Sequence, residues 1–176
     1  MNSFVRLPAP LADCLVLREP QAEDRQLWME LHEDAAVRDF LGAGPTTNDD
    51  FGLTSQIEMW SAGKGSVLIV SIGPERRAVG FCAALLSSSP DGARDPQIQV
   101  AIHKSFRKCD YAKRALRLLI GALQENSRFS RICGYVDVCN ERSHALVRAL
   151  GMKVLGERTS GQRQETWYAI ERLSGA

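Results

Sequence analysis

A strand that runs through a short turn directly into a helix constrains the fold of this chain most. Residues 97–102, QIQVAI, have the character of a strand, and residues 112–124 repeat apolar side chains at helical spacing. The first backbone N–H groups of such a helix have no intrahelical partners. Together with the positive end of the helix dipole, they favour an anion such as a pyrophosphate. The sequence therefore predicts an anion-binding turn between this strand and this helix.

The composition is that of an ordinary globular protein. The chain has 176 residues, of which 44% are hydrophobic and 24% charged, and its formal net charge is +1. This length suits one domain over residues 1–176, with a core from about 13 to 172. The near-neutral charge argues against nucleic-acid and membrane partners. Because there is no long apolar run and no signal-peptide pattern at the start, we expect a cytoplasmic protein.

The cysteines and histidines give no sign of a disulfide framework or a metal site. The number of cysteines is odd, no CxxC pair occurs, and the three histidines show no ligand spacing. Three cysteines lie in or beside apolar, strand-like stretches, where they pack as small hydrophobic side chains, so we expect free thiols in a reducing compartment. The cysteines are Cys14, Cys82, Cys109, Cys133 and Cys139.

Periodicity and turn residues predict the order β-α-α-β-β-β-α-β-α-β-β. This order indicates one α/β domain with antiparallel strands in its middle and helices covering the sheet. Two polar segments, 87–96 and 159–163, are expected as loops, and Asn140 and Gly151 as the caps of the last helix. The expected strands are 15–18, 67–72, 78–86, 97–103, 132–138, 152–155 and 166–170, and the other helices are 22–41, 50–61 and 112–124.

Three local features carry a resemblance to a known family. The first is the strand, turn and helix over residues 97–123, and the second is an N-x-x-S sequence from Asn140 to Ser143. The third is Ala149-Leu150-Gly151-Met152 before a strand. The chain resembles the GCN5-related N-acetyltransferase (GNAT) family, and most of all the subgroup that acetylates ribosomal-protein N-termini. The resemblance implies a mixed, mostly antiparallel sheet with a splayed central strand and helices on both faces.

The resemblance also implies an activity. Acetyl-CoA would serve as cosubstrate in the opening beside the splayed strand, with its pantetheine arm along the backbone of residues 102–104. Acetyl would pass directly to a primary amine, either a protein N-terminus or a small amine, with a water-relayed base. The implied catalytic residues are Ser143 and Gln97. The implied cosubstrate-binding residues are Ile102, Lys104, Arg107, Lys108, Cys109, Asp110, Tyr111, Ala112, Asn140 and Ser143.

The sequence departs from the family pattern at three positions. Lys108 and Asp110 replace glycines of the pyrophosphate turn, and Gln97 stands where relatives often carry a glutamate base. We hypothesise that the carboxylate of Asp110 caps its own helix and so occupies the N–H groups that phosphate needs. Asp95, two residues before Gln97, is either a substitute base on the same strand face or a turn residue. These departures leave a second hypothesis, a catalytically silent ligand-binding or protein-interaction module.

Several other side chains admit two interpretations. His103 is a base or a polar strand end, and His144 lies near the thioester or, more simply, on a solvated helix face. Tyr111 stacks on a ligand or packs in the core. The chain is a monomer or a homodimer, and a strand edge at 166–170 would pair two copies. Trp28, Trp60 and Trp167 fill the core or wall an acceptor groove.

Overall fold

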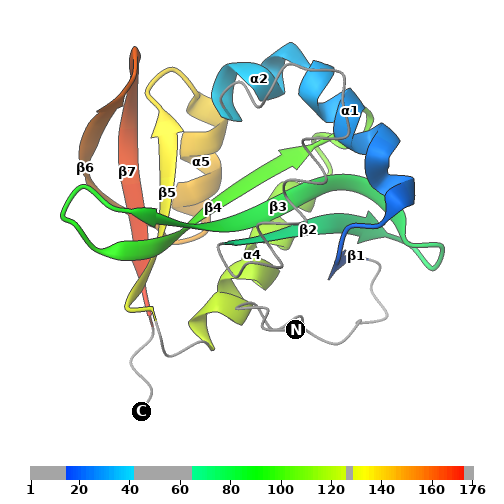
Figure 1. Ribbon diagram of the computed structural model, residues 1–176, viewed down its shortest axis with the longest axis horizontal. Coiled ribbons are helices and arrows are strands. Elements are labelled where there is room, and N and C mark those ends of the chain that lie inside the picture. Colours follow the sequence, from blue (N-terminus) through cyan, green and yellow to red (C-terminus); the bar gives the residue numbers. More distant parts are fainter. Residues whose placement is uncertain (1–14, 42–64, 126–128, 173–176) are drawn as a thin grey trace.

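The computed structural model describes residues 15–41, 65–125 and 129–172 (Figure 1). Its strands form one seven-stranded sheet in the order β1-β2-β3-β4-β5-β7-β6. The strands are β1 (Leu15–Arg18), β2 (Gly65–Ile72), β3 (Arg77–Ser88), β4 (Arg94–Ile102), β5 (Arg131–Asp137), β6 (Lys153–Ser160) and β7 (Arg163–Glu171). The helices are η1 (Ala22–Asp24), α1 (Arg25–Glu33), α2 (Ala35–Leu41), η2 (Lys104–Phe106), α4 (Tyr111–Gln124) and α5 (Glu141–Ala149). The predicted helix 50–61, with Trp60, and Cys14 lie outside the described residues.

Helices cover both faces of the sheet, as predicted (Figure 1). On one face, the apolar stripe of α4 packs with α5 against the sheet, and Leu116, Leu119 and Leu123 are buried there. On the other face, Trp28 and Leu31 of α1 pack on Phe81 of β3 in a second core. The two cores hold the sheet between them, so the position of each strand is fixed from both sides.

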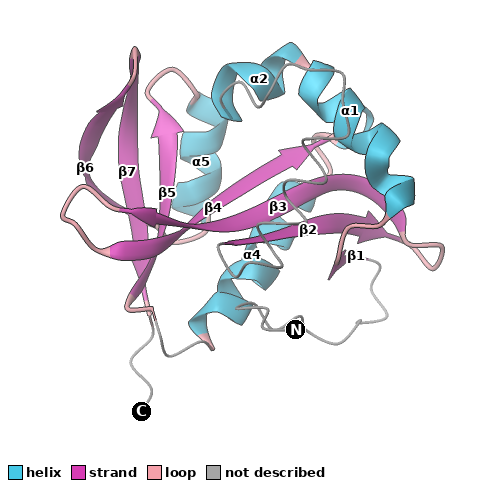
Figure 2. Cartoon of the chain, in the orientation of Figure 1, coloured by secondary structure: helices cyan, strands magenta, loops and turns pink. Residues whose placement is uncertain are grey.

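The sheet opens between β4 and β5, where the prediction placed a splayed strand. β4 pairs with β3 through nine register positions, and β5 with β7 through seven. β4 and β5 are parallel and share a single position, Gln97 with Cys133. Figure 2 shows the two strands diverging beyond that point. The backbone of β4 past Gln97 is therefore left without a ladder partner on its β5 side.

The β3–β4 hairpin is longer than the sequence predicted. Residues 87–96 were expected as a loop, but Ser88 pairs with Arg94 and only residues 89–93 make the turn. The loop was predicted to extend to Pro96 because proline has no backbone N–H to donate to a strand ladder. In β4 its nitrogen faces β5 rather than β3, so no β3–β4 hydrogen bond is lost.

The predicted helix 22–41 is broken at Asp34. The backbone of Asp34 is extended, with φ −70° and ψ 115°, and its Oδ1 accepts a hydrogen bond from the Ala36 N–H at 2.9 Å. Aspartate competes for local backbone donors in this way, so it ends α1 and starts α2. The break turns α2 over the sheet, above the opening (Figure 1).

The C-terminal strands also correct the prediction. Residues 159–163 were expected as a loop, but they belong mainly to β6 and β7, which meet in a turn at Gly161 and Gln162. The segment 166–170 is not an edge, because β7 lies between β5 and β6. The exposed edge on this side is β6, where Val154 and Leu155 are about half exposed.

The cysteines lie partly where the sequence placed them. Cys82 is buried in the sheet as a small apolar side chain, whereas the buried Cys133 sulfur accepts a hydrogen bond from Trp167 Nε1 at 3.4 Å. Burial raises the pKa of both thiols. Cys109 and Cys139 are exposed. All four are free thiols.

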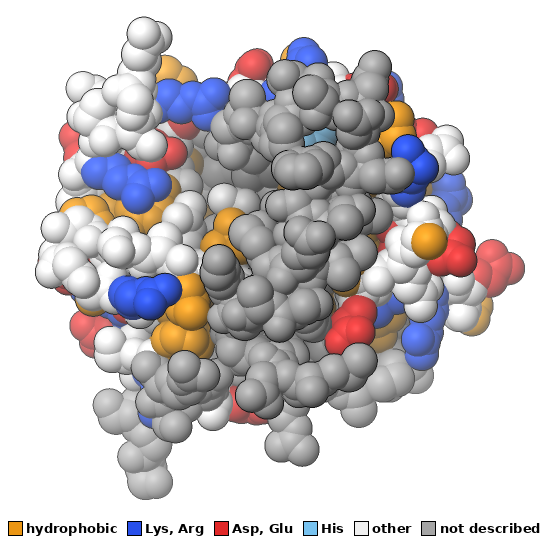
Figure 3. Space-filling model, in the orientation of Figure 1, with side chains coloured by type: hydrophobic (Ala, Val, Ile, Leu, Met, Phe, Trp, Pro, Cys, Tyr) orange, Lys and Arg blue, Asp and Glu red, His pale blue; other side chains and the backbone are white. Residues whose placement is uncertain are grey.

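The surface carries no dominant sign of charge on the face seen in Figure 3. Basic and acidic side chains are interspersed over its described part. This mixture agrees with the net charge of +1. Within the described residues, no helix is both long and apolar enough to cross a bilayer.

Gly80 tests how tightly β3 holds β4 in place. A Cβ at this position would lie 2.2 Å from the carbonyl oxygen of Ala101, which is backbone and cannot rotate away. We expect Gly80→Ala to lower the free energy of unfolding by about 1–3 kcal/mol in urea titrations. Gly121→Ala is the matched control, since a Cβ there meets nothing within 4 Å in helix α4. It should raise stability by about 0.5–1 kcal/mol. Equal effects of the two substitutions would contradict this view of the β3–β4 contact.

Candidate active site

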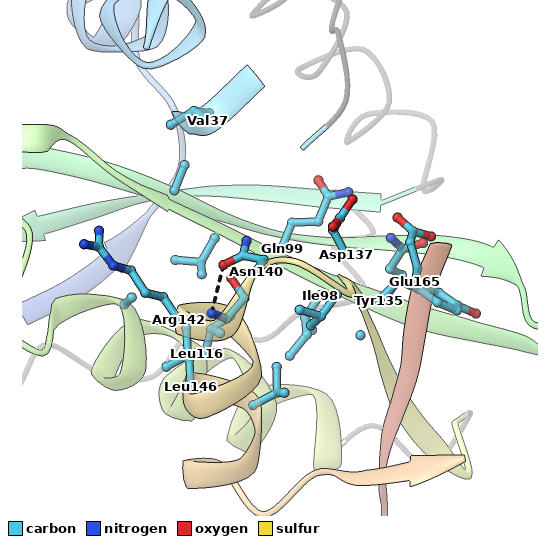
Figure 4. A pocket seen from close by; sticks show the side chains of 18 of the residues that line it. Val37, Ile98, Gln99, Leu116, Tyr135, Asp137, Asn140, Arg142, Leu146 and Glu165 are labelled. Atoms are coloured by element: carbon cyan, nitrogen blue, oxygen red, sulfur yellow. Dashed lines mark hydrogen bonds between the residues drawn. The ribbon is translucent and has the colours of Figure 1, made fainter. Parts of the chain in front are cut away.

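A cavity of about 640 Å³ occupies the opening between β4 and β5. Its walls belong to both faces of the sheet. Figure 4 shows Leu116 and Leu146 on the side of α4 and α5, and Gln99 and Asp137 on the side of α2. The cavity therefore passes through the sheet and connects its two faces.

One end of the cavity is the turn that leads into α4. Lys108 and Asp110 both adopt left-handed backbone conformations, with φ of 67° and 59°. These are the two positions where the family pattern has glycine, and here two non-glycine residues adopt the positive φ that glycine permits. Arg107 and Ala112, on either side, line the cavity.

The hypothesis that Asp110 blocks this turn with its side chain is wrong. Asp110 occupies the N-cap position, but its side chain makes no capping hydrogen bond. The carboxylate instead lies 3.7 Å from the ammonium of Lys113 and is 60% exposed. Asp110 therefore leaves the first N–H groups of α4 uncapped, so that within the described part of the chain they are available to an anion.

Arg107 is held by two contacts within the protein. Its Nη2 donates to Asp34 Oδ2 at 2.6 Å, and its Nε donates to the carbonyl oxygen of Ile102 at 3.0 Å. The first contact ties the turn to the break between α1 and α2. The second satisfies a backbone acceptor at the end of β4. Arg107 thus connects the turn before α4 to the end of β4 and to the break between α1 and α2.

The ion pair perturbs the carboxylate of Asp34. Partial burial acts to raise the pKa of Asp34, but hydrogen bonds from Arg107 and from the Ala36 N–H outweigh it. The pKa therefore lies below its ordinary value of 3.8. Asp34 is a charged partner of Arg107 at neutral pH.

The backbone of β4 offers hydrogen-bonding groups inside the opening. The His103 N–H donates to Val79 of β3, and the His103 carbonyl accepts from Phe106. Alternate residues of a strand point to opposite neighbours, so the backbone groups of Val100 and Ile102 point toward β5. Since Arg107 already uses the carbonyl of Ile102, the groups of Val100 are the freest in the opening.

The start of α5 forms the opposite wall. Asn140 caps this helix as predicted, and its Oδ1 accepts the Ser143 N–H at 3.1 Å, the bond drawn in Figure 4. Both residues line the cavity. The Ser143 hydroxyl makes no hydrogen bond within the described part of the chain, so it can serve a ligand. Gly151 ends the helix with φ 82°, as its sequence position predicted.

The second end of the cavity is polar and lies under α2. Gln97 lines the cavity, and its Oε1 accepts a hydrogen bond from the Ser87 hydroxyl at 3.2 Å. Its amide NH₂ makes no hydrogen bond within the described residues and is left as a donor. Asp137 at the end of β5 also lines the cavity, and its Oδ1 accepts the Cys139 N–H at 2.9 Å. Its other oxygen is without a partner in the described residues. Asp137 is thus a carboxylate presented to the cavity.

Asp95 is not a substitute for a base at position 97. It is buried and lies outside the cavity lining. Arg131 Nε donates to Asp95 Oδ2 at 2.8 Å, and the Ser89 hydroxyl donates to the same oxygen at 2.7 Å. This arrangement joins the β3–β4 hairpin to β5, so the role of Asp95 is structural.

Neither histidine weighed above lies in the cavity lining. His103 Nε2 lies 3.4 Å from Glu30 of α1. His144 is buried, and its Nδ1 shares a hydrogen bond of 2.9 Å with the Tyr168 hydroxyl. The expectation of a solvated His144 is therefore wrong, because β7 brings Tyr168 beneath α5.

The structure brings together about half of the residues predicted for the site. Tyr111 packs against the core under α4, as one of its two interpretations held. Trp28 and Trp167 are core residues. The predicted residues that line the cavity are Gln97, Ile102, Arg107, Ala112, Asn140 and Ser143. Those outside the lining are Lys104 of η2, Lys108, Cys109 and Asp110 of the turn, and Tyr111, the first residue of α4.

The polar residues at the second end of the cavity were not predicted from the sequence. They come from β5, β6 and β7, which are separated along the chain and meet only through strand pairing. The usable signal was the alternation of polar residues in the last hairpin, where one strand face carries successive charges. The missed charged residues of this end are Asp137, Arg158, Arg163 and Glu165. Val100 of β4, an apolar residue of the cavity lining, was missed as well.

The family is established by comparison. The acetyltransferase (GNAT) domain matches residues 15–153, which is most of the chain. The chain therefore belongs to the GNAT family of acetyltransferases, as its strand, turn and helix indicated. No curated protein matches it significantly in sequence.

Solved structures share the fold. An apo structure of RimL, the ribosomal L7/L12 α-N-protein acetyltransferase, has a TM-score of 0.77 at 15% identity, covering 95% of this chain and 94% of that chain. RimL in complex with coenzyme A gives 0.76 at 14%, with 92% and 96% covered. Spermidine N-acetyltransferase from Vibrio cholerae, in complex with coenzyme A and spermine, gives 0.76 at 13%, with 90% and 95% covered.

The Asp34–Arg107 pair has a pH-dependent contribution to stability. Because the folded-state pKa of Asp34 is lowered, this contribution is present above the ordinary pKa and is lost as the pH falls through the lower one. We expect Asp34→Asn to cost about 0.5–1 kcal/mol at neutral pH, the range for a partly solvated pair. The difference in melting temperature from the wild type should shrink as the pH falls below the ordinary pKa of 3.8. Asp39→Asn, on the exposed face of α2, is the control. A difference that is independent of pH would contradict the ion-pair account.

Proposed function

We propose that this chain is an acetyl-CoA-dependent N-acetyltransferase that acts on a primary amine, either a protein N-terminus or a small amine. The observation that carries the proposal is the cavity through the sheet. It joins an uncapped helix start on one side to a carboxylate-bearing end on the other. Such a passage lets an anionic donor and an amine acceptor approach one point from opposite faces.

The residues present suit the donor. The free N–H groups at the start of α4, with Lys108 beside them, would hold the pyrophosphate. The unpaired backbone groups of Val100 would hydrogen-bond the extended pantetheine arm, as a neighbouring strand would. Asn140 and Ser143 would lie at its thiol end, on the opposite wall. When bound, acetyl-CoA supplies the thioester from which acetyl is transferred.

The chemistry assigned to the protein is polarisation and proton transfer. A backbone N–H of β4 in the opening would polarise the acetyl carbonyl. The Ser143 hydroxyl would donate a proton or a hydrogen bond to the sulfur as the C–S bond breaks. Gln97 cannot take a proton, but its free NH₂ can orient a water or the acceptor. Asp137, with one unpaired oxygen, is then the carboxylate best placed to accept the amine proton, directly or through that water.

The direct test is calorimetric titration with acetyl-CoA, followed by an amine screen that detects free coenzyme thiol. Micromolar binding and acceptor-dependent thiol release are the expected results. No binding under these conditions would overturn the proposal and favour the silent module instead. Binding without release for any amine would separate a coenzyme-binding module from an enzyme.

Ser143 is tested by removal of its hydroxyl. We expect Ser143→Ala to lower kcat by about 10²-fold, the lower range for loss of a positioned proton donor, with little change in acetyl-CoA affinity. The control is Ser105→Ala, an exposed serine of η2 outside the cavity lining. Steady-state rates with acetyl-CoA and one active amine give the comparison. An unchanged kcat would remove Ser143 from the chemistry.

Lys108 and Asp110 form a matched pair, because both are left-handed and carry opposite charges. Replacing either with glycine relieves the same backbone strain and removes one charge near the proposed pyrophosphate. We expect Asp110→Gly to tighten acetyl-CoA binding by about two- to fivefold and Lys108→Gly to weaken it similarly, because both charges are exposed and screened. Calorimetry measures both. A gain far above tenfold for Asp110→Gly would contradict this account, in which the carboxylate acts only as an exposed, screened charge.

A further inference from the structure

Four charged side chains line the second end of the cavity, and two of them neutralise each other. Arg158 Nε donates to Glu165 Oε2 at 2.8 Å. The same guanidinium lies over the ring of Tyr135, 3.2 Å from its centroid. Arg158 and Glu165 are thus held by one another and by the wall of the cavity. Neither is free to bind a charged acceptor without breaking these contacts.

The other two charged side chains, Asp137 and Arg163, make no ion pair within the described residues. One carboxylate oxygen of Asp137 accepts a hydrogen bond from the Cys139 N–H, and the other has no partner within the described residues. Arg163 is partly exposed and makes no ion pair or hydrogen bond within the described part of the chain. The two do not pair with each other, although they line the same cavity. This second end of the cavity therefore presents one unpaired acidic and one unpaired basic side chain, both from the sheet.

Strand pairing fixes the distance between the backbone positions of Asp137 and Arg163. Asp137 of β5 lies directly opposite Glu165 of β7. Arg163 is two residues before Glu165 and so lies on the same face of the sheet. Residues in this diagonal relation are about 7–8 Å apart along the backbone. Their side chains can hold groups of opposite charge that lie a few bonds apart in one molecule.

We propose that the acceptor carries a carboxylate within about one residue of the reacting amine, with Asp137 holding the ammonium and Arg163 the carboxylate. This inference rests on the proposed function. It narrows the acceptor to a free amino acid or to a peptide whose first residue is acidic. It disfavours polyamines, because Arg163 would repel a second cationic centre. A guanidinium is well suited to the task, since it binds carboxylate through two parallel hydrogen bonds.

The experiment uses the full chain, acetyl-CoA and two matched acceptor pairs. Aspartyl-alanine amide is compared with asparaginyl-alanine amide, which differ only in a side-chain carboxylate. Alanine is compared with alanine amide, which differ only in the α-carboxylate, and spermidine serves as the polyamine. We expect kcat/KM to favour the acidic member of at least one pair by about tenfold. The pair that shows the preference tells whether the carboxylate belongs to a side chain or to a free amino acid.

Variants assign the preference to Arg163. Arg163→Gln should reduce the ratio within the favoured pair to about one, and Arg163→Lys should keep part of it. Arg148→Gln, an exposed arginine of α5 outside the cavity lining, should leave the ratio and the rates unchanged. Melting temperatures show that each variant is folded.

The outcomes separate this inference from the proposed function. Equal rates within both pairs, or a preference for spermidine, would overturn the inference while the transferase stands. A ratio that survives in Arg163→Gln would overturn the role of Arg163. Acetyl-CoA binding without transfer to any of the five acceptors would overturn the acceptor class. Failure to bind acetyl-CoA would overturn the proposed function, and the inference with it.

Discussion

The site depends on one constraint, the single register position that β4 and β5 share. Gln97 and Cys133 pair, and past them the strands separate because each is held by its other neighbour, β4 by β3 and β5 by β7. Cores on both faces keep the strands in these positions. The backbone groups left unpaired in a sheet are costly if buried and dry, so an opening of this kind is stable only where water or a ligand can enter. The cavity between β4 and β5 meets that condition.

Arg107 connects this opening to the rest of the fold. It satisfies the Ile102 carbonyl at the end of β4 and pairs with Asp34, where α1 gives way to α2. Ala36 and Val37 of α2 line the cavity from above. The turn before α4, which would hold an anion, and helix α2, which covers the second end of the cavity, are therefore connected through the guanidinium of Arg107. A change in the position of either is expected to reach the other through this contact.

The sequence was informative where structure is local and weak where it depends on distant strands. The strand, turn and helix of β4 and α4, the Asn140 cap and the Gly151 stop were predictable because capping and periodicity act within a few residues. The break at Asp34 was missed although its capping bond to Ala36 is local, and its ion pair with Arg107, 73 positions away along the chain, was not predictable. The polar residues at the second end of the cavity were missed because they come from separate strands, and β5 and β7 meet only in the folded sheet. Burial of His144 likewise follows from a partner on β7.

The passage of the cavity through the sheet has a consequence for the order of events in a catalytic cycle. The residues that line the cavity lie on both faces of the sheet, some near the start of α4 and others beneath α2. Two substrates that enter by different routes do not have to pass each other, and neither product traps the other inside. Entry from opposite faces would therefore impose no compulsory order of binding, and any order seen in kinetics would then come from the coupling of the two ends rather than from obstruction.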